Sequence, residues 1–125
     1  TFQQRMVYNQ PAGHWDEGET LIAAAIRETR EETAWSVNIE SWLGMYAYTA
    51  PSNNITYLRI AFVGEAREFL NTNLDNGIQE AVWMNYETLL TKEQAGELRS
   101  PLVKKVIDDY RSGIRIPLSA IYHQK

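Results

Sequence analysis

Apolar and polar residues follow two different periods along this chain, and the change of period separates the predicted elements. From Leu21 to Thr33 apolar and small residues recur at helical spacing, which predicts an amphipathic helix. From Ser36 to Thr49, and again from Ile55 to Ala66, the pattern becomes a loose alternation rich in β-branched and aromatic residues, which predicts strands. The turn-forming run from Pro51 to Asn54 separates these strands, so we expect a long antiparallel hairpin with a bulge at Gly44.

Shorter elements are predicted on both sides of the hairpin. Ser100 and Pro101 are typical of a helix N-cap and first helical position, and the apolar stripe that follows them ends at Gly113. The remaining predicted segments are a strand at Met6 to Tyr8, a strand at Ala81 to Met84, a helical turn at Tyr86 to Leu90 and a tail at Ile114 to Ile121 that packs back on the domain. Helices and strands together give an α+β (mixed α/β) fold class.

Length, composition and charge restrict the classes of partner. With 125 residues, 44% of them hydrophobic and 22% charged, the chain has the composition of one globular domain, residues 1–125. The net charge of −4 argues against a broad footprint on a phosphate backbone, so the expected partner is a small, metal-neutralised anion rather than polymeric nucleic acid. The chain has no cysteine and no long apolar run, so we expect a cytoplasmic protein that does not contact a membrane.

The first predicted helix carries the candidate chemistry. At about 100° per residue, Glu28, Glu31 and Glu32 fall within an arc of roughly 100° on one face. Carboxylates this close repel one another, and a hard divalent cation such as Mg²⁺, which prefers oxygen ligands, would offset the repulsion. A solvated, salt-bridged helix end is the alternative interpretation when these acids are considered alone.

A longer pattern decides between these two interpretations. It consists of Gly13, Glu19, Arg27, Glu28, Glu31 and Glu32. Their spacing is that of the Nudix box, and the chain resembles the Nudix hydrolase family at every charged position of the box. The resemblance implies a Nudix-type α/β/α sandwich with a mixed sheet. It also implies hydrolysis of phosphoanhydrides with Mg²⁺, or Mn²⁺, as the cofactor.

The family's site residues are carried over to the positions that match. The metal ligands implied are Glu28, Glu31, Glu32 and the backbone carbonyl of Ala12 or Gly13. By the same resemblance Arg27 and Glu19 brace the helix, and one of the metal-binding acids also serves as the base. No covalent intermediate is needed, because a bound cation can neutralise the phosphate charge while water attacks.

A few positions depart from the family pattern. Ala34 stands where the box usually has glycine, and Thr29 stands where it usually has an aliphatic residue. Glycine there is typical of a left-handed helix C-cap, which alanine adopts at a cost on the order of 1 kcal/mol. Outside the box, Gly77 stands where the family often has an extra glutamate. Asp75 or Glu80 could substitute for it, and the alternative is that both are solvated loop acids. None of these changes removes a ligand of the box.

The segment before the box is short. Twelve residues precede Gly13, whereas Nudix domains normally place a longer strand-rich segment there. We therefore expect a sheet that lacks the usual N-terminal strands, and self-association through its open edge. The alternative is that the tail from Ile114 to Ile121 occupies the vacant position.

Three further segments narrow the resemblance. They are NQPAGH at Asn9 to His14, LRSPLV at Leu98 to Val103, and a spaced pattern from Tyr110 to Leu118. All are similar to the NudJ-type phosphatases within the Nudix family, which implies release of phosphate from nucleoside tri- and diphosphates and from the pyrimidine diphosphate precursor of thiamine. Two other functions stay open. The spacing of Pro51 from the box is seen in ADP-ribose pyrophosphatases, and a third alternative is a catalytically silent nucleotide-binding domain.

Residues outside the box are candidates for binding the substrate. Arg59, in the middle of the second hairpin strand, is a candidate for a phosphate contact, and Asn9 is a further candidate. Tyr46, Tyr48 and Tyr57 could each stack on a base, because an aromatic face accepts any nucleobase. Core or cross-strand packing is the alternative for each tyrosine.

Overall fold

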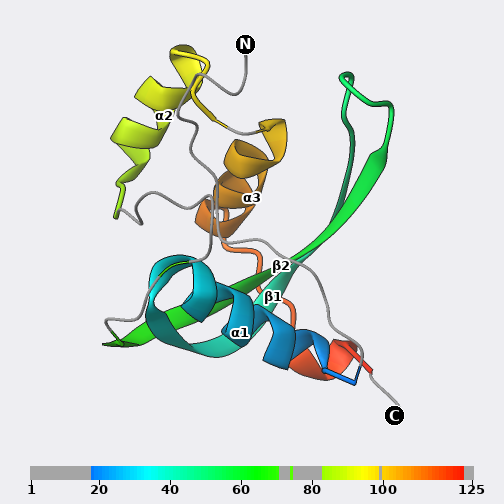
Figure 1. Cartoon of the computed structure of the whole chain (residues 1–125), viewed down its shortest axis with the longest axis vertical. Coiled ribbons are helices and arrows are strands. Elements are labelled where there is room, and N and C mark those ends of the chain that lie inside the picture. The colour runs from blue at the N-terminus through cyan, green and yellow to red at the C-terminus, as the bar shows by residue number, and fades with distance from the viewer. Residues whose placement is uncertain (1–17, 71–73, 75–82, 99, 123–125) are drawn as a thin grey trace.

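The computed structural model of the chain describes residues 18–70, 74, 83–98 and 100–122. Its elements in chain order are the helix α1 (Leu21–Thr33), the strands β1 (Trp35–Thr49) and β2 (Thr56–Phe69), the helices α2 (Tyr86–Gln94) and α3 (Pro101–Arg111), and the 3₁₀ helix η2 (Leu118–Ala120). β1 and β2 form a long hairpin whose tip projects beyond the helices, while α1 lies against its other half (Figure 1). Helices and antiparallel strands together confirm the predicted α+β fold class.

α1 begins and ends where the sequence pattern predicted. Thr20 is the N-cap, and its Oγ1 accepts a hydrogen bond from the Ala23 amide at 3.1 Å. At the other end Ala34 has φ 64° and ψ 18°, and its amide donates to the Arg30 carbonyl at 2.8 Å. The left-handed C-cap is therefore formed by alanine, and the chain passes from it directly into β1.

The hairpin also follows the prediction. β1 and β2 pair in one antiparallel ladder, and a register shift between Trp42 and Gly44 confirms the predicted bulge. In the turn, Asn54 has φ 57° and its amide donates to the Ala50 carbonyl at 2.8 Å. β2 continues to Phe69 and is longer at this end than predicted.

The two C-terminal helices start at polar caps. Asn85 caps α2, and the Ser100 Oγ accepts a hydrogen bond from the Leu102 amide at 3.2 Å at the start of α3. Pro101 occupies the first turn of α3, as predicted. α2 runs to Gln94, so it is a full helix rather than the predicted single turn. No helix in the described part of the chain is both long and apolar enough to cross a membrane.

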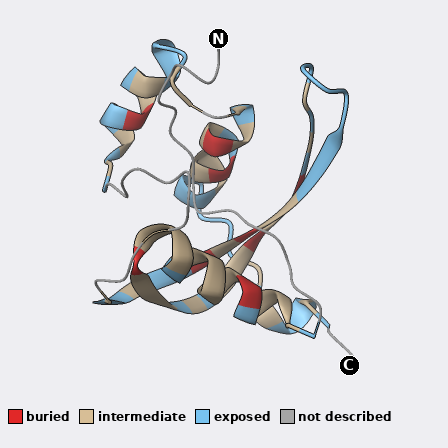
Figure 2. Ribbon diagram, in the orientation of Figure 1, coloured by how far each residue is buried: buried red, intermediate tan, exposed pale blue. Residues whose placement is uncertain are grey.

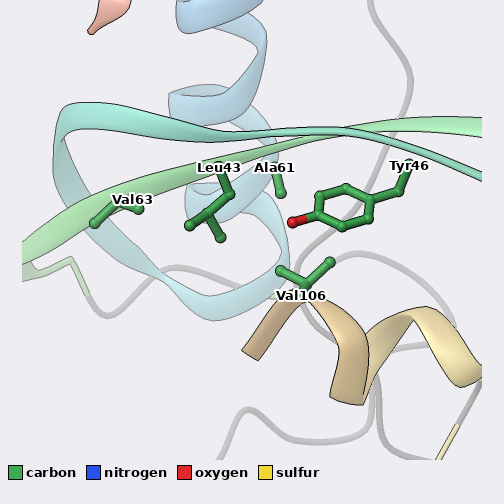
Figure 3. Close-up of a cluster of buried hydrophobic side chains, with 5 residues drawn as sticks. All are labelled: Leu43, Tyr46, Ala61, Val63 and Val106. Atoms are coloured by element: carbon green, nitrogen blue, oxygen red, sulfur yellow. The ribbon is translucent and has the colours of Figure 1, made fainter. Parts of the chain in front are cut away.

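The core lies between the hairpin and α3. Its buried side chains, which converge in Figure 3, are Leu43, Tyr46, Ala61, Val63 and Val106. The hydroxyl group of Tyr46 donates a hydrogen bond to Asp109 Oδ2 at 2.8 Å, which fixes the ring against α3. For Tyr46 the structure therefore supports the packing interpretation rather than base stacking.

The opposite face of the hairpin is exposed. Met45 and Leu58 leave 61% and 71% of their surface open, and they point away from the core because side chains alternate along a strand. Figure 2 shows exposed residues along the projecting half of the hairpin. One face of this half therefore packs, and the other leaves apolar side chains uncovered.

The described strands supply only the antiparallel part of the predicted mixed sheet. Within the described residues the sheet consists of β1 and β2. The predicted strand at Met6 to Tyr8 lies outside the described residues. The prediction of a strand at Ala81 to Met84 is wrong for Trp83 and Met84, which pair with no strand in the described part of the chain. Ala81 and Val82 lie outside the described residues.

The C-terminal tail packs back on the hairpin, as predicted. The Trp42 amide donates to the Ile116 carbonyl at 2.9 Å, and the Ile116 amide donates to the Trp42 carbonyl at 2.7 Å. The indole Nε1 of Trp42 also donates to the Pro117 carbonyl at 3.1 Å. The tail thus covers the outer edge of β1 at one residue, and no other pairing covers that edge among the residues described.

Candidate functional site

Arg27 joins the segment before α1 to the acid-bearing face of that helix. Its Nε donates to Glu19 Oε2 at 2.7 Å, and its Nη2 donates to Glu19 Oε1 at 3.0 Å. This two-point contact fixes both the position and the plane of the guanidinium. Because Glu19 directly precedes the N-cap, the ion pair ties the entry to the helix to its second turn.

The same guanidinium also binds two acids of α1. Nη1 of Arg27 donates to Glu28 Oε1 at 2.7 Å and to Glu31 Oε1 at 2.9 Å. The side chains of Arg27, Glu28 and Glu31 are only 20%, 16% and 32% exposed, so water screens these ion pairs less than it screens surface pairs. The structure therefore brings together four of the residues predicted for the site.

Ala24 lies on the same side of α1 as the acids. It precedes Glu28 by four residues, and residues four apart share a face of a helix. Ala24 is 7% exposed and is the buried residue within α1. The helical turn before Glu28 is thus buried at Ala24, which restricts the movement of Glu28 and Arg27.

Glu32 faces a second arginine, which comes from the hairpin. Arg59 lies in β2 opposite Tyr46, on the hairpin face that packs against the helices. Burial lowers the pKa of the Arg59 guanidinium, whereas the negative charge of Glu32 acts to raise it. Nη1 of Arg59 is buried and has no hydrogen-bond partner in the described part of the chain. An unpaired buried donor is costly, so this nitrogen is available to an anion.

The acids of this site outnumber its arginines. Among the described residues, four carboxylates, those of Glu19, Glu28, Glu31 and Glu32, lie around the two guanidinium groups of Arg27 and Arg59. Carboxylate oxygens are the ligands that Mg²⁺ prefers. Among the described residues, no three acidic or histidine side chains form a group that could hold a metal ion, and Arg27 binds one oxygen each of Glu28 and Glu31.

The other two tyrosine candidates are partners across the hairpin. Tyr48 lies opposite Tyr57. Tyr57 is 47% exposed, and its hydroxyl oxygen accepts a hydrogen bond from Asn53 Nδ2 at 2.9 Å. Tyr48 is half-buried and lines a pocket of about 330 Å³ at the start of α3. The sequence analysis missed this pocket, although residues of the LRSPLV segment line it and gave a signal.

The remaining predicted site residues belong to other parts of the chain. Asn9, Ala12 and Gly13 lie outside the described residues, as do the loop acids Asp75 and Glu80. Their roles in binding substrate or metal stay predictions.

Comparison with known proteins gives concordant results. A NUDIX domain is matched over residues 2–106. The chain is 38% identical over 122 residues to the Phosphatase NudJ of Escherichia coli (strain K12) and to that of Shigella flexneri, and the match covers 97% of this chain and 77% of each relative. Its structure is similar to that of a NUDIX hydrolase from Nitrosomonas europaea, with a TM-score of 0.88 and 40% identity over 93% of this chain and 78% of that one.

Proposed function

The chain belongs to the NUDIX domain family and is a Nudix hydrolase that acts on phosphoanhydrides, and from this premise we propose that it releases phosphate from nucleoside tri- and diphosphates with Mg²⁺ as cofactor. The observation that carries the proposal is the buried, unpaired Nη1 of Arg59 beside the acid face of α1. An anion site and an excess of carboxylates thus lie next to each other.

This pairing of charges favours a metal-bound phosphate over other anions. The carboxylates alone would repel a phosphate, and Arg59 alone would bind any small anion. A divalent cation between them satisfies the acids and the phosphate oxygens together. The substrate class that fits is therefore a short, highly charged phosphate chain on a small molecule.

Each residue of the site has a role in this proposal. Glu28, Glu31 and Glu32 would hold Mg²⁺, together with the carbonyl of Ala12 or Gly13. When bound, Mg²⁺ supplies positive charge that offsets the charge of the phosphates and favours attack by water.

The protein's own groups position the reactants. Arg27 and Glu19 hold the acid face in place through their ion pair. Arg59 donates from Nη1 to a phosphate oxygen, and one of the acids of α1 accepts the proton of the attacking water. Asn9 and Tyr57 are the further substrate contacts proposed from the sequence.

Product identification tests the proposed reaction. The protein is incubated with nucleoside triphosphates, nucleoside diphosphates and ADP-ribose, with and without Mg²⁺, and phosphate, diphosphate and nucleotide products are separated. We expect orthophosphate and a nucleotide shortened by one phosphate, and no reaction when Mg²⁺ is chelated. Mn²⁺ should restore part of the activity.

Two outcomes would contradict the proposal. AMP and ribose phosphate from ADP-ribose, with no orthophosphate from nucleotides, would show a pyrophosphatase instead. Tight nucleotide binding without any product would show a silent domain, although the four acids and the arginine of the box are all present.

We also propose self-association through the hairpin, in a cytoplasmic protein. The exposed Met45 and Leu58 support it, as does the outer edge of β1, which Ile116 covers at a single residue in the described structure. Light scattering should give a mass above that of one chain. Replacement of Leu58 by Lys should raise the solubility of the protein. A monomeric wild type whose solubility this change leaves the same would contradict the proposal.

A further inference from the structure

A pocket lies between the start of α3 and the inner face of the hairpin, which is the face that packs against the helices. It is lined by Tyr48, Glu93, Gly96, Leu98, Ser100, Pro101 and Lys104. Its volume is about 330 Å³, at the lower end of the range for small-molecule sites. A space of this size can hold a single ring system.

The hairpin register places this pocket next to the phosphate-binding candidate. Arg59 lies opposite Tyr46, and the next pair on the same face, two residues toward the tip, is Tyr48 opposite Tyr57. Two residues along a strand span about 7 Å. A molecule whose phosphates contact Arg59 could therefore extend along the inner face and reach Tyr48.

α3 supports the same placement. Asp109 of α3 binds the Tyr46 hydroxyl group at 2.8 Å. Lys104 precedes it by five residues, which is about 7.5 Å along a helix, and it lines the pocket beside Tyr48. β1 and α3 therefore both extend from the region of Tyr46 and Arg59 to the pocket.

The charges of the pocket argue against a second phosphate there. Lys104 Nζ lies 2.6 Å from Asp108 Oδ2, so its charge is already paired. The pKa of Lys104 is raised first by this hydrogen bond, and the charge of Glu93 adds to the rise. With one ammonium group between two carboxylates, the pocket has no surplus of positive charge to attract a phosphate.

The polar groups that remain suit a heterocycle. The ring of Tyr48 offers a face for stacking. Lys104 has further N–H donors beyond the one that binds Asp108, and the carboxylate of Glu93 is an acceptor. Donor, acceptor and aromatic face together match a nucleobase, whereas an aliphatic chain would leave the polar groups without partners.

We propose that this pocket binds the nucleobase of the substrate, with Tyr48 stacking on the ring and Glu93 accepting a hydrogen bond from an exocyclic amino group. This rests on the proposed function for the position of the phosphates. The hydrogen bond to Glu93 makes the enzyme favour CTP over UTP and ATP over ITP. In each pair the first base has an amino group where the second has an oxo group.

The stacking role is tested with Tyr48→Leu and the matched control Tyr110→Leu, an exposed tyrosine of α3 that does not line the pocket. Loss of a base-stacking face should raise KM for CTP roughly 5- to 100-fold in the first variant, and the increase should fall on KM rather than kcat. The control should keep the wild-type KM. Inhibition by inorganic tripolyphosphate, which has phosphates and no ring, should be the same in both.

The amino-group contact is tested with Glu93→Gln and the matched control Glu87→Gln, on the same helix but not in the pocket. The neutral amide should lower the ratio of kcat/KM for CTP to that for UTP by about 5- to 10-fold, because a charged acceptor is replaced by a group that also donates. An unchanged ratio would show that Glu93 does not contact the base.

The outcomes separate this inference from the proposed function. If the wild type hydrolyses nucleotides and Tyr48→Leu leaves KM for CTP unchanged, the pocket does not bind the base and the proposed reaction stands. If the wild type hydrolyses no nucleotide, the proposed reaction fails. Calorimetric titration with CMP then tests the pocket, since weaker binding by Tyr48→Leu than by Tyr110→Leu supports it and equal binding overturns it.

Discussion

α1 and α3 each carry five charged residues, but they arrange them differently. In α3, Lys104 pairs with Asp108 at 2.6 Å and Lys105 pairs with Asp109 at 3.0 Å. Each lysine thus has one acid four residues later, and the charges of these two pairs balance. In α1, by contrast, a single guanidinium, that of Arg27, is shared between Glu28, Glu31 and Glu19.

The aspartates of α3 are fully used within the protein. Asp108 accepts a hydrogen bond from the Tyr86 hydroxyl group at 2.7 Å, which joins α3 to α2, and Asp109 accepts one from Tyr46 of β1. The pKa of Asp108 is lowered mainly by Lys104, and that of Asp109 mainly by Tyr46. Charges that are paired and hydrogen-bonded in this way hold elements together, whereas we propose that the clustered acids of α1 bind a ligand.

The largest effect is expected from Glu31→Gln or Glu32→Gln. Each change keeps the shape of the side chain and removes a ligand charge, so Mg²⁺-dependent hydrolysis should fall by about 100-fold or more with little loss of stability. In α3, Asp109→Asn should do the opposite, with stability lowered by about 1 kcal/mol and the rate nearly kept. Steady-state rates and denaturant midpoints give both quantities. Glutamine variants with wild-type rates would show that the metal site is elsewhere.

Arg27→Met removes the positive charge that Glu19, Glu28 and Glu31 share. We expect the free energy of unfolding to fall by about 1 to 2 kcal/mol without metal, a value reduced for partial exposure of these groups. Added Mg²⁺ should raise the melting temperature of this variant more than that of the wild type, because the cation replaces the missing charge.

Lys105→Met is the control for this experiment, since it removes one member of a balanced pair in α3. Its free energy of unfolding should fall by less than that of Arg27→Met. Added Mg²⁺ should raise its melting temperature no more than that of the wild type. An equal response of both variants to Mg²⁺ would contradict the distinction between the two helices.

The link between β1 and α3 predicts a loss of stability at high pH. Burial raises the pKa of Tyr46 to about 12, and its hydrogen bond to Asp109 is the second cause. The folded state then holds the phenolic proton of Tyr46 more tightly than the unfolded state does. The stabilisation that this gives the folded state is complete below about pH 10 and is lost as the pH rises to about 12. Tyr46→Phe should lower stability by about 1 kcal/mol at pH 7 and remove this part of the alkaline loss. Parallel stability curves from pH 7 to 12 would contradict the assignment.

The smallest effect is expected from Ala34→Gly. Glycine relieves a left-handed strain of about 1 kcal/mol, but it also loses a buried methyl group worth about 0.8 kcal/mol and raises the entropy of the unfolded chain. Ala34 is only 2% exposed, so these effects oppose each other and the net change should stay within about 0.5 kcal/mol. A denaturant midpoint that shows a gain above about 1 kcal/mol would mean that the methyl group contributes nothing to packing.

The sequence by itself determined the features that depend on local chemistry. The bounds of α1, the left-handed Ala34, the bulge at Gly44 and the cap at Ser100 follow from short-range backbone preferences, and the structure confirms them. The acid face of α1 also follows, because helical spacing alone places Glu28 and Glu31 together. The family follows from the spacing of the box, and the matched NUDIX domain confirms it.

Only the tertiary structure decided which distant groups meet. The proximity of the Arg59 and Glu32 charges, the hydrogen bond of Tyr46 to Asp109 and the pocket lined by Tyr48 and Lys104 each bring together residues far apart in the chain. Sequence periodicity gives the face on which a residue lies, but it does not give the element that packs against that face. Three tyrosines with the same pattern in the sequence therefore have different surroundings, one in the core, one lining a pocket and one exposed, because the packing of α3 covers the hairpin unevenly.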